Sequence, residues 1–368
     1  MKEYPIGLVP GPVSIPANIR EAWLTDFGSS DLEPDFFELY AENQSLVQRL
    51  LGTKESVVIT SGEAMSILWG GLKSALKPGD RLLAVASGLF GEGFADMAKA
   101  LGIETEVAAS EYDSLPDPRK VREAALRFRP QMLTAVHCET PSGTLTPLKE
   151  LGEIAREIGA LFLVDFVSSG GGAAVNADEN QIDIGLLGSQ KALSLPPSLS
   201  ISTIGPRGWK AIEKVNYSGY DAYLPWRNVP EVTAMPYTHD WHSMKALHIS
   251  LSSIMKEGME NVFARHSRAA ALCRKAALEM GLRLFPVSED ICSPTVSAFY
   301  VPEGWTWGEF DEALRKRGLV VGGNYGRLAG RVFRIGHMGS QADESLVVRG
   351  MDIVKTVLSE KRGKKGVD

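Results

Sequence analysis

The stretch Ile182-Asp-Ile-Gly-Leu-Leu-Gly-Ser-Gln-Lys-Ala-Leu-Ser-Leu-Pro-Pro197 places a lysine directly after an apolar segment. The apolar run at 184–187 predicts a buried strand, and Gly188 and Ser189 predict the turn where that strand leaves its sheet. Most lysines lie on solvated faces, whereas Lys191 is held between this strand and a rigid Leu-Pro-Pro segment. Partial loss of water lowers the pKa of an amine and makes it a better nucleophile toward a carbonyl.

A carboxylate ends a second predicted strand, Ala160-Leu-Phe-Leu-Val-Asp165. Ligands of open α/β sheets bind at the carboxyl ends of strands, so we expect Asp165 and Lys191 to meet across one crevice. Taken alone, Asp165 would be interpreted as a helix cap or a loop carboxylate. The pair instead suits an aldehyde cofactor: a lysine amine condenses with pyridoxal 5′-phosphate (PLP), and a buried aspartate keeps the pyridine nitrogen of that cofactor protonated.

Three motifs carry a resemblance to a known family: Val136-His-Cys-Glu-Thr-Pro-Ser-Gly143, Val164-Asp-Phe-Val-Ser-Ser-Gly-Gly171 and Gly188-Ser-Gln-Lys-Ala-Leu193. They resemble the class V aminotransferases, in particular the alanine–glyoxylate and serine–pyruvate branch. The similarity runs from Leu8-Val-Pro-Gly-Pro12 to Phe333-Arg-Ile-Gly336, nearly the whole chain. It implies an α/β protein of the PLP-dependent transferase fold type I, with a large mixed-sheet domain and a small C-terminal α/β domain.

The resemblance also implies a domain organisation and an activity. We expect residues 1–20 to lie over the active site, residues 21–245 to form the PLP-binding domain and residues 246–368 to form the small domain. One long helix is expected from Ser243 through Gly258 to Gly281. The implied activity is transamination of a small amino acid, of the alanine or serine type, with a 2-oxo acid such as glyoxylate or pyruvate, by a homodimer.

Several cofactor contacts are implied by the resemblance. Phe90 stacks on the ring, Val167 packs on the opposite face, and the hydroxyl of Thr140 approaches the ring oxygen. The phosphate is held by residues that lie near the lysine or reach across from the neighbouring subunit, namely Ser61, Gly62, Ser189, Gln190, Tyr237 and Thr238.

Glu63 departs from the family pattern at the phosphate seat, which is the turn of Ser61 and Gly62 with the helix start that follows. Free N–H groups and the dipole of a helix N-terminus favour a phosphate there. Aimed at a phosphate, a carboxylate would cost about 4 kcal/mol for two unit charges ~4 Å apart at an effective dielectric of ~20. We expect Glu63 to face solvent; the alternative is an unphosphorylated pyridoxal or pyridoxamine, because the Gly-Glu pair resembles pyridoxamine–pyruvate aminotransferases.

A guanidinium lies on an apolar strand in Arg331-Val-Phe-Arg-Ile-Gly-His-Met-Gly339. The planar fork of Arg334 suits a substrate carboxylate, and an internal salt bridge is the alternative. The resemblance favours the substrate role, and it also brings the backbone of Gly11 close to the substrate. Tyr325 and Arg327 lie in the preceding loop, where either could reach a second anionic group.

Composition narrows the possible partners. A chain of 368 residues with 44% hydrophobic content can form a large domain and a smaller one. The net charge is −6, and the one basic cluster, Lys361-Arg-Gly-Lys-Lys365, lies in an expected frayed tail, 361–368, so no nucleic acid is expected. No apolar stretch approaches the roughly 18 residues of a membrane span, and the N-terminus lacks a secretory signal, which predicts a cytoplasmic protein without a membrane partner.

The cysteines bear on metal binding and on one further enzyme class. Three scattered cysteines are too few for a disulfide framework or a zinc site, so no metal is expected. A cysteine desulfurase or lyase needs a reactive cysteine on a flexible loop, whereas Cys292 opens the apolar run Ser293-Pro-Thr-Val-Ser-Ala-Phe299. This function is a less favoured alternative, and transamination of 2-aminoethylphosphonate with pyruvate stays open as another. A cofactor-binding regulator would need a DNA-reading helix pair, for which the chain has no room.

Overall fold

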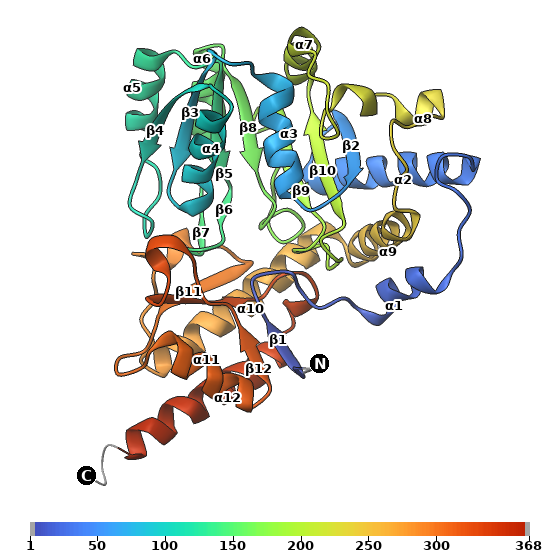
Figure 1. Ribbon diagram of the computed structural model, residues 1–368. Coiled ribbons are helices and arrows are strands. Elements are labelled where there is room, and N and C mark those ends of the chain that lie inside the picture. The colour runs from blue at the N-terminus through green and yellow to red at the C-terminus, as the bar shows by residue number, and fades with distance from the viewer. Residues whose placement is uncertain (1–3, 365–368) are drawn as a thin grey trace.

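Seven strands form one mixed sheet in the upper part of the molecule in Figure 1. The figure shows a computed structural model, which describes residues 4–364. Neighbouring strands from β9 to β4 are parallel, whereas β10 is antiparallel to both of its neighbours. In spatial order the strands are β2 (Ser56–Ser61), β10 (Leu199–Ile204), β9 (Ile184–Gly188), β8 (Leu161–Asp165), β5 (Met132–Val136), β3 (Arg81–Ala86) and β4 (Glu104–Ala109).

The two strands predicted from the lysine and aspartate motifs are central in this sheet. β8 and β9 are buried along their whole length, which explains why they are continuous apolar runs and not alternating ones. They are parallel and adjacent, with Asp165 in register with Leu186. Their carboxyl ends therefore lie at the same edge of the sheet, and this edge carries the predicted site.

Helices pack around the large sheet (Figure 1). They are α2 (Pro34–Leu51), α3 (Met65–Ala75), α4 (Leu89–Ala100), α5 (Pro118–Phe128), α6 (Lys149–Glu157), α7 (Pro206–Val215), α8 (Val229–Val232) and α9 (Trp241–Glu257). Between them lie the short hairpin of β6 (Cys138–Glu139) and β7 (Thr144–Leu145) and two 3₁₀ turns, η1 (Glu21–Leu24) and η2 (Leu224–Trp226). Within residues 4–364, no helix is both long enough and apolar enough to cross a membrane.

The single helix expected from Ser243 to Gly281 is two helices, and the prediction was wrong on this point. α9 ends at Glu257, and α10 (Met259–Glu279) begins after Gly258. Gly258 has φ 88° and ψ 133°, a conformation that only glycine adopts at low cost. Its N–H closes α9 on Ile254 and its carbonyl accepts the first bond of α10, so the chain turns without losing hydrogen bonds.

The smaller domain is assembled from both ends of the chain. β1 (Ile6–Leu8) pairs in parallel with β12 (Leu319–Val321), and β11 (Val296–Tyr300) pairs antiparallel with β13 (Val332–Gly336). These strands pack with α10, α11 (Trp307–Lys316) and α12 (Glu344–Lys364) in the lower part of Figure 1. The remaining short elements are α1 (Ala17–Arg20), η3 (Glu289–Ile291), η4 (Gly326–Leu328) and η5 (Gly339–Gln341).

Two separate apolar cores show where the domains divide. Buried side chains of α9, such as Leu247 and Leu251, belong to the core of the large sheet, whereas Cys273 and Ala277 of α10 belong to the smaller core. We therefore propose a division within α10 in place of residue 246. The tail expected at 361–368 is helical as far as Lys364, the end of α12, and residues 365–368 lie outside the described part.

Candidate active site

Lys191 lies on the turn after β9, with the N-terminal segment packed against it. Its Nζ donates a hydrogen bond to the carbonyl oxygen of Pro10. A Cβ atom on Gly11, which has φ 88°, would lie 2.7 Å from Nζ, so only glycine lets the segment approach this closely. Burial, together with the nearby charge of Arg334, lowers the pKa of Lys191 from 10.5 to about 8. The lysine therefore has the desolvated character predicted from its sequence context.

Asp165, the last residue of β8, is buried and lies within electrostatic reach of Lys191. Burial raises the pKa of its carboxyl from 3.8 to about 6, while the N–H of Val167 and the charge of Lys191 oppose that rise. The Val167 N–H donates to Oδ1 of Asp165 over 2.8 Å and fixes the orientation of the carboxyl group. The structure thus brings together the two residues that the strand ends predict to meet.

Arg334 on β13 is only 4% exposed and forms no ion pair with a carboxylate in the described part of the chain. Its Nε donates to the carbonyl oxygen of Gly323 over 2.8 Å, and its Cζ lies 5.0 Å from the ring centroid of Tyr325. Burial lowers the pKa of the guanidinium. Among the described residues, Arg334 therefore does not form the internal salt bridge that was the alternative. Its desolvated guanidinium lies within electrostatic reach of Lys191.

Glu63 is exposed to solvent, as expected, but its carboxylate also contacts residues of the phosphate seat. As a residue it is exposed, yet its Oε1 accepts a hydrogen bond from Gln190 Nε2 over 2.7 Å. Its Oε2 accepts from the N–H of Met65, the first residue of α3, over 2.9 Å. The carboxylate therefore uses an N–H at the start of α3 and lies beside the residue that precedes Lys191.

The other expected phosphate donors already have partners within the chain. The Ser189 hydroxyl is fully buried and donates to the Pro196 carbonyl over 2.6 Å. The Thr238 hydroxyl donates to Asp31 over 3.0 Å. The Ser61 hydroxyl accepts from the backbone N–H of Asp240 over 3.2 Å, which leaves its own proton free to donate.

Tyr237 and Thr238, expected to reach a neighbouring subunit, are exposed and lie near the end of β2 of their own chain. Both line one small hollow together with Ser61. The ring of Tyr237 packs on that of Tyr220, with centroids 4.7 Å apart. Within a single chain the two residues are therefore surface groups next to the phosphate seat.

The expected ring contacts surround the same edge of the sheet. Phe90 is the second residue of α4 and is partly buried against the large core, and Val167 lies two residues after Asp165. A Cβ on Gly188 would lie 3.2 Å from Val167 Cγ1, so a larger residue at 188 would take space beside Val167. The Thr140 hydroxyl is buried and hydrogen-bonds to the Ser168 hydroxyl.

The buried carboxylate of Glu139 holds the first turn of α4, which carries Phe90. Glu139 accepts hydrogen bonds from the N–H groups of Gly91, over 2.7 Å, and Phe90, over 3.2 Å. Its side chain is completely buried, and burial raises its pKa from 4.5 to about 8. Neither this cap of α4 nor the contact of Lys191 with Pro10 has a local sequence signal, because both join segments that are distant along the chain.

Similarity to known proteins shows the family to which this chain belongs. A family model described as aminotransferase class-V matches residues 23–323. The chain belongs to the class V aminotransferases. An uncharacterized aminotransferase of Methanocaldococcus jannaschii is 32% identical over 96% of this chain and 92% of that protein. The pyridoxamine–pyruvate transaminase of Mesorhizobium japonicum is 31% identical over 85% of this chain and 81% of that protein. The crystal structure of an alanine–glyoxylate aminotransferase from Nostoc sp. superposes with a TM-score of 0.93 at 27% identity, covering 97% of this chain and 96% of that one.

The predicted fold and enzyme class are thereby confirmed: this class V aminotransferase has a large mixed-sheet domain and a small C-terminal domain. The family uses PLP. The site has an amine, a buried carboxylate and a guanidinium that forms no ion pair among residues 4–364, and these groups fit such a cofactor. Bound there, the cofactor would supply an electron sink. The chain would supply the amine of Lys191, which would hold and move a proton, and the carboxyl of Asp165, which would keep the ring nitrogen protonated.

The thiols do not support the desulfurase alternative. Cys292 is partly buried, its Sγ donates to the Ser288 carbonyl, and burial raises its pKa to about 11. Cys138 and Cys273 are fully buried, and burial raises their pKa values to about 11 and about 12. All three are therefore protonated at neutral pH, whereas the nucleophile of such an enzyme is a thiolate.

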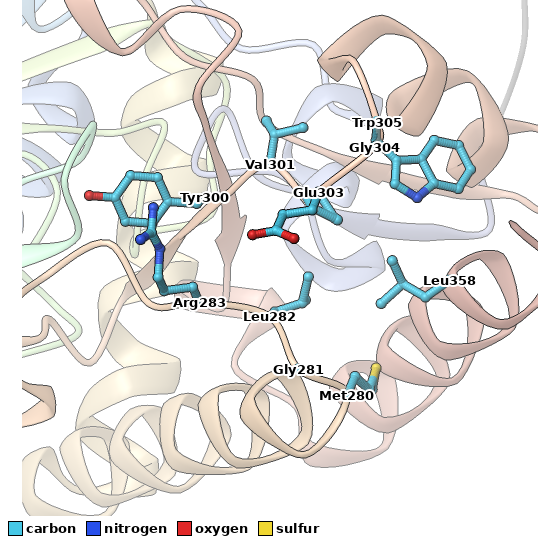
Figure 2. Close-up of a pocket in the computed structure, with 11 residues that line it drawn as sticks. Met280, Gly281, Leu282, Arg283, Tyr300, Val301, Glu303, Gly304, Trp305 and Leu358 are labelled. Carbon is cyan, nitrogen blue, oxygen red and sulfur yellow. The ribbon is translucent and has the colours of Figure 1, made fainter. Parts of the chain in front are cut away.

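A separate hollow of about 540 Å³ lies on the smaller domain (Figure 2). Arg283 lies over the ring of Tyr300, with 3.8 Å between Cζ and the ring centroid, and Glu303 projects toward the middle of the hollow. The residues that line it, among those described, include none of the predicted site residues. It is therefore distinct from the site around Lys191.

Proposed function

We propose that this chain transfers an amino group from a small amino acid of the alanine or serine type to a 2-oxo acid such as glyoxylate or pyruvate, with PLP as cofactor. The observation that carries the proposal is Arg334, a buried guanidinium without a carboxylate partner in the described residues, within electrostatic reach of Lys191. A substrate carboxylate would neutralise it. The reaction balances because the donor carbon exchanges its amino group for the carbonyl oxygen of the acceptor, with no net oxidation.

The residues around the substrate carbon have separate tasks in this proposal. Lys191, with a pKa of about 8, has a neutral fraction near neutral pH and is able to take the α-proton of the donor and return it to the cofactor. Asp165, with a pKa of about 6, is mostly ionised at neutral pH and would hold the ring nitrogen protonated. Arg334 would orient the carboxylate, and the carbonyl of Pro10 and the Cα of Gly11 would limit access to the lysine from the N-terminal side.

Glu63 supports a second candidate, in which free pyridoxamine is the amino donor and pyruvate the acceptor. Its carboxylate bonds to Gln190 and to the first N–H of α3, so two groups that would serve a phosphate serve a side-chain anion. A relative that carries out this reaction, the pyridoxamine–pyruvate transaminase of Mesorhizobium japonicum, is 31% identical. Both candidates use Lys191, Asp165 and Arg334. They differ in the amino donor and in what occupies the phosphate seat.

We further propose that the chain acts as a homodimer. Large apolar side chains are exposed on the segments that flank Tyr237 and Thr238, among them Leu32 at 78%, Tyr220 at 63% and Val232 at 60%. The side chain of Asp31, next to Leu32, bonds to Thr238, which places the two segments side by side. A second copy would cover this surface, and sedimentation velocity at micromolar concentration should then give twice the mass of the chain. A single species of one chain mass would exclude the dimer.

The two functions are separated by half-reactions. Holoenzyme prepared with PLP is mixed with alanine, serine or 2-aminoethylphosphonate, and enzyme without cofactor is mixed with pyridoxamine and pyruvate. The first candidate requires a cofactor spectral change with alanine or serine and formation of the matching 2-oxo acid. Conversion of pyridoxamine and pyruvate to pyridoxal and alanine without PLP would favour the second. Absence of transfer with all four donors, with glyoxylate and with pyruvate as acceptor, would contradict both candidates.

A further inference from the structure

An exposed aromatic residue covers the buried guanidinium of Arg334. Tyr325, in the loop between β12 and β13, is 58% exposed, whereas Arg334 is 4% exposed. The ring centroid lies 5.0 Å from Cζ of Arg334. Burial lowers the pKa of the guanidinium, and the nearby Tyr325 side chain opposes that change. The ring therefore stands between the cation and solvent.

The loop that carries Tyr325 is fixed on one side by the large domain. Asn324 Nδ2 donates to the carbonyl oxygen of Pro141 over 2.8 Å, directly after Thr140. A Cβ on Gly326 would lie 3.1 Å from Leu89 Cδ1, next to Phe90. The neighbours of Tyr325 thus touch both segments that are expected to contact the cofactor ring.

On its other side the loop is fixed by Arg327. The guanidinium of Arg327 pairs with Glu92 of α4 over 2.7 Å and lies over the ring of Tyr112, 3.4 Å from Cζ to the centroid. Leu328 is buried with Tyr112 in a small apolar cluster. Held at both ends, the loop leaves Tyr325 little freedom to move away by a shift of the backbone.

These contacts limit how a substrate reaches Arg334. Nε of Arg334 donates to the Gly323 carbonyl, so within the described residues the two Nη atoms remain as donors for a carboxylate. The ring of Tyr325 lies beside this guanidinium. A carboxylate bound bidentately there would lie close to the ring of Tyr325, whose centroid is 5.0 Å from Cζ of Arg334. A second anionic group would need another free cation, and Arg327, the other cation of this loop, is already paired with Glu92.

We propose that Tyr325 is a specificity-determining residue: its ring closes the carboxylate subsite at Arg334 and restricts the acceptor to short monocarboxylic 2-oxo acids. The proposal rests on the proposed role of Arg334 as the carboxylate-binding residue. It adds the residue that would limit the size and charge of the acceptor, for which both candidate functions name short monocarboxylic 2-oxo acids only as examples.

The test compares pyruvate with 2-oxopentanoate, which is two methylenes longer, in the half-reaction that consumes the aminated cofactor. Wild type, Tyr325→Ala, Tyr325→Phe and Arg334→Leu are loaded with pyridoxamine 5′-phosphate or pyridoxamine, whichever the wild type retains. Each methylene accepted by a newly opened apolar space is worth about tenfold or more in kcat/KM. Tyr325→Ala should therefore shift the ratio of kcat/KM toward the longer acid by at least about tenfold, whereas Tyr325→Phe, which keeps the ring, should retain the wild-type ratio.

Oxaloacetate gives a second readout, because its extra carboxylate tests the charge restriction. Oxaloacetate should react poorly with wild type. The double variant Tyr325→Ala/Glu92→Gln removes the ring and frees Arg327 from its ion pair, so it should raise kcat/KM for oxaloacetate relative to pyruvate. An unchanged ratio of pyruvate to 2-oxopentanoate in Tyr325→Ala would overturn the proposal, as would an equal shift in Tyr325→Phe. Should Arg334→Leu retain wild-type kcat/KM for both acids, the proposed function itself fails, and that outcome is separate from any effect at Tyr325.

Discussion

The amide of Gln190 donates a hydrogen bond to the carboxylate of Glu63 over 2.7 Å, one residue before the lysine at the centre of the site. Both side chains belong to the region where a phosphate is expected. A carboxylate placed there satisfies donors that a phosphate would otherwise use, and it repels a dianion. We therefore expect this contact to affect which form of vitamin B6 the site accepts.

Replacing Glu63 by serine should tighten PLP by a margin of order 1–3 kcal/mol, because one charge contact is removed and the amide of Gln190 is freed. The affinity for pyridoxal, which has no phosphate, should change much less. Titration of apoenzyme with both vitamers, wild type beside Glu63→Ser and Glu63→Gln, measures the difference. Equal changes for both vitamers would show that Glu63 acts only as a cap of α3.

Lys191→Met should stabilise the apoenzyme at pH 7 while it abolishes transamination. Burial holds the pKa of this amine at about 8 instead of 10.5, so the folded state binds its proton less tightly than the unfolded state does. The cost of the buried charge, up to about 3 kcal/mol, is fully present below pH 8 and vanishes as the pH rises toward 10.5. Thermal denaturation between pH 7 and 10 should show the advantage of the variant shrinking as the pH rises. A variant less stable than wild type at pH 7 would show that the bond to Pro10 outweighs that cost.

Arg334→Leu should raise KM for 2-oxo acids by about 10- to 100-fold, because a hydrogen-bonded charge contact contributes about 1.5–3 kcal/mol. Binding of pyridoxamine, which has no carboxylate, should be retained. Arg334→Lys is the matched variant: it keeps the charge but loses the planar fork, and it should recover only part of the loss. Steady-state kinetics and pyridoxamine titrations provide both measurements. Equal weakening of acids and pyridoxamine would identify Arg334 as a structural residue.

Glu139→Gln tests the buried carboxylate that caps α4. Because burial raises its folded pKa from 4.5 to about 8, the folded state keeps its proton more tightly than the unfolded state. Wild type therefore loses stability as the pH rises from about 4.5 to 8, and an amide at this position does not titrate. The melting temperature of the variant relative to wild type should increase over that range and then become constant. A difference that is independent of pH would mean that Glu139 is ionised in the folded protein throughout.

The sequence allowed the central sheet and half of the site to be predicted, for a local reason. Asp165 and Lys191 each follow an apolar strand, and the rule that ligands bind at strand ends brings them together without any tertiary information. The contact of Lys191 with Pro10 spans 181 residues and that of Arg327 with Glu92 spans 235, so no local pattern indicates either. The break at Gly258 was missed because apolar periodicity continues through a residue whose φ of 88° ends one helix and starts another.

The most direct test of the account is to find which amine holds the aldehyde. Apoenzyme is incubated separately with PLP and with pyridoxal, reduced with borohydride, digested and examined by mass spectrometry, with Lys191→Met as the control. We expect the added mass on the peptide that contains Lys191, and we expect it to disappear from that peptide in the variant. The amounts obtained with the two aldehydes report the preference at the phosphate seat. An unmodified Lys191, with the label on other lysines or on none, would contradict the account.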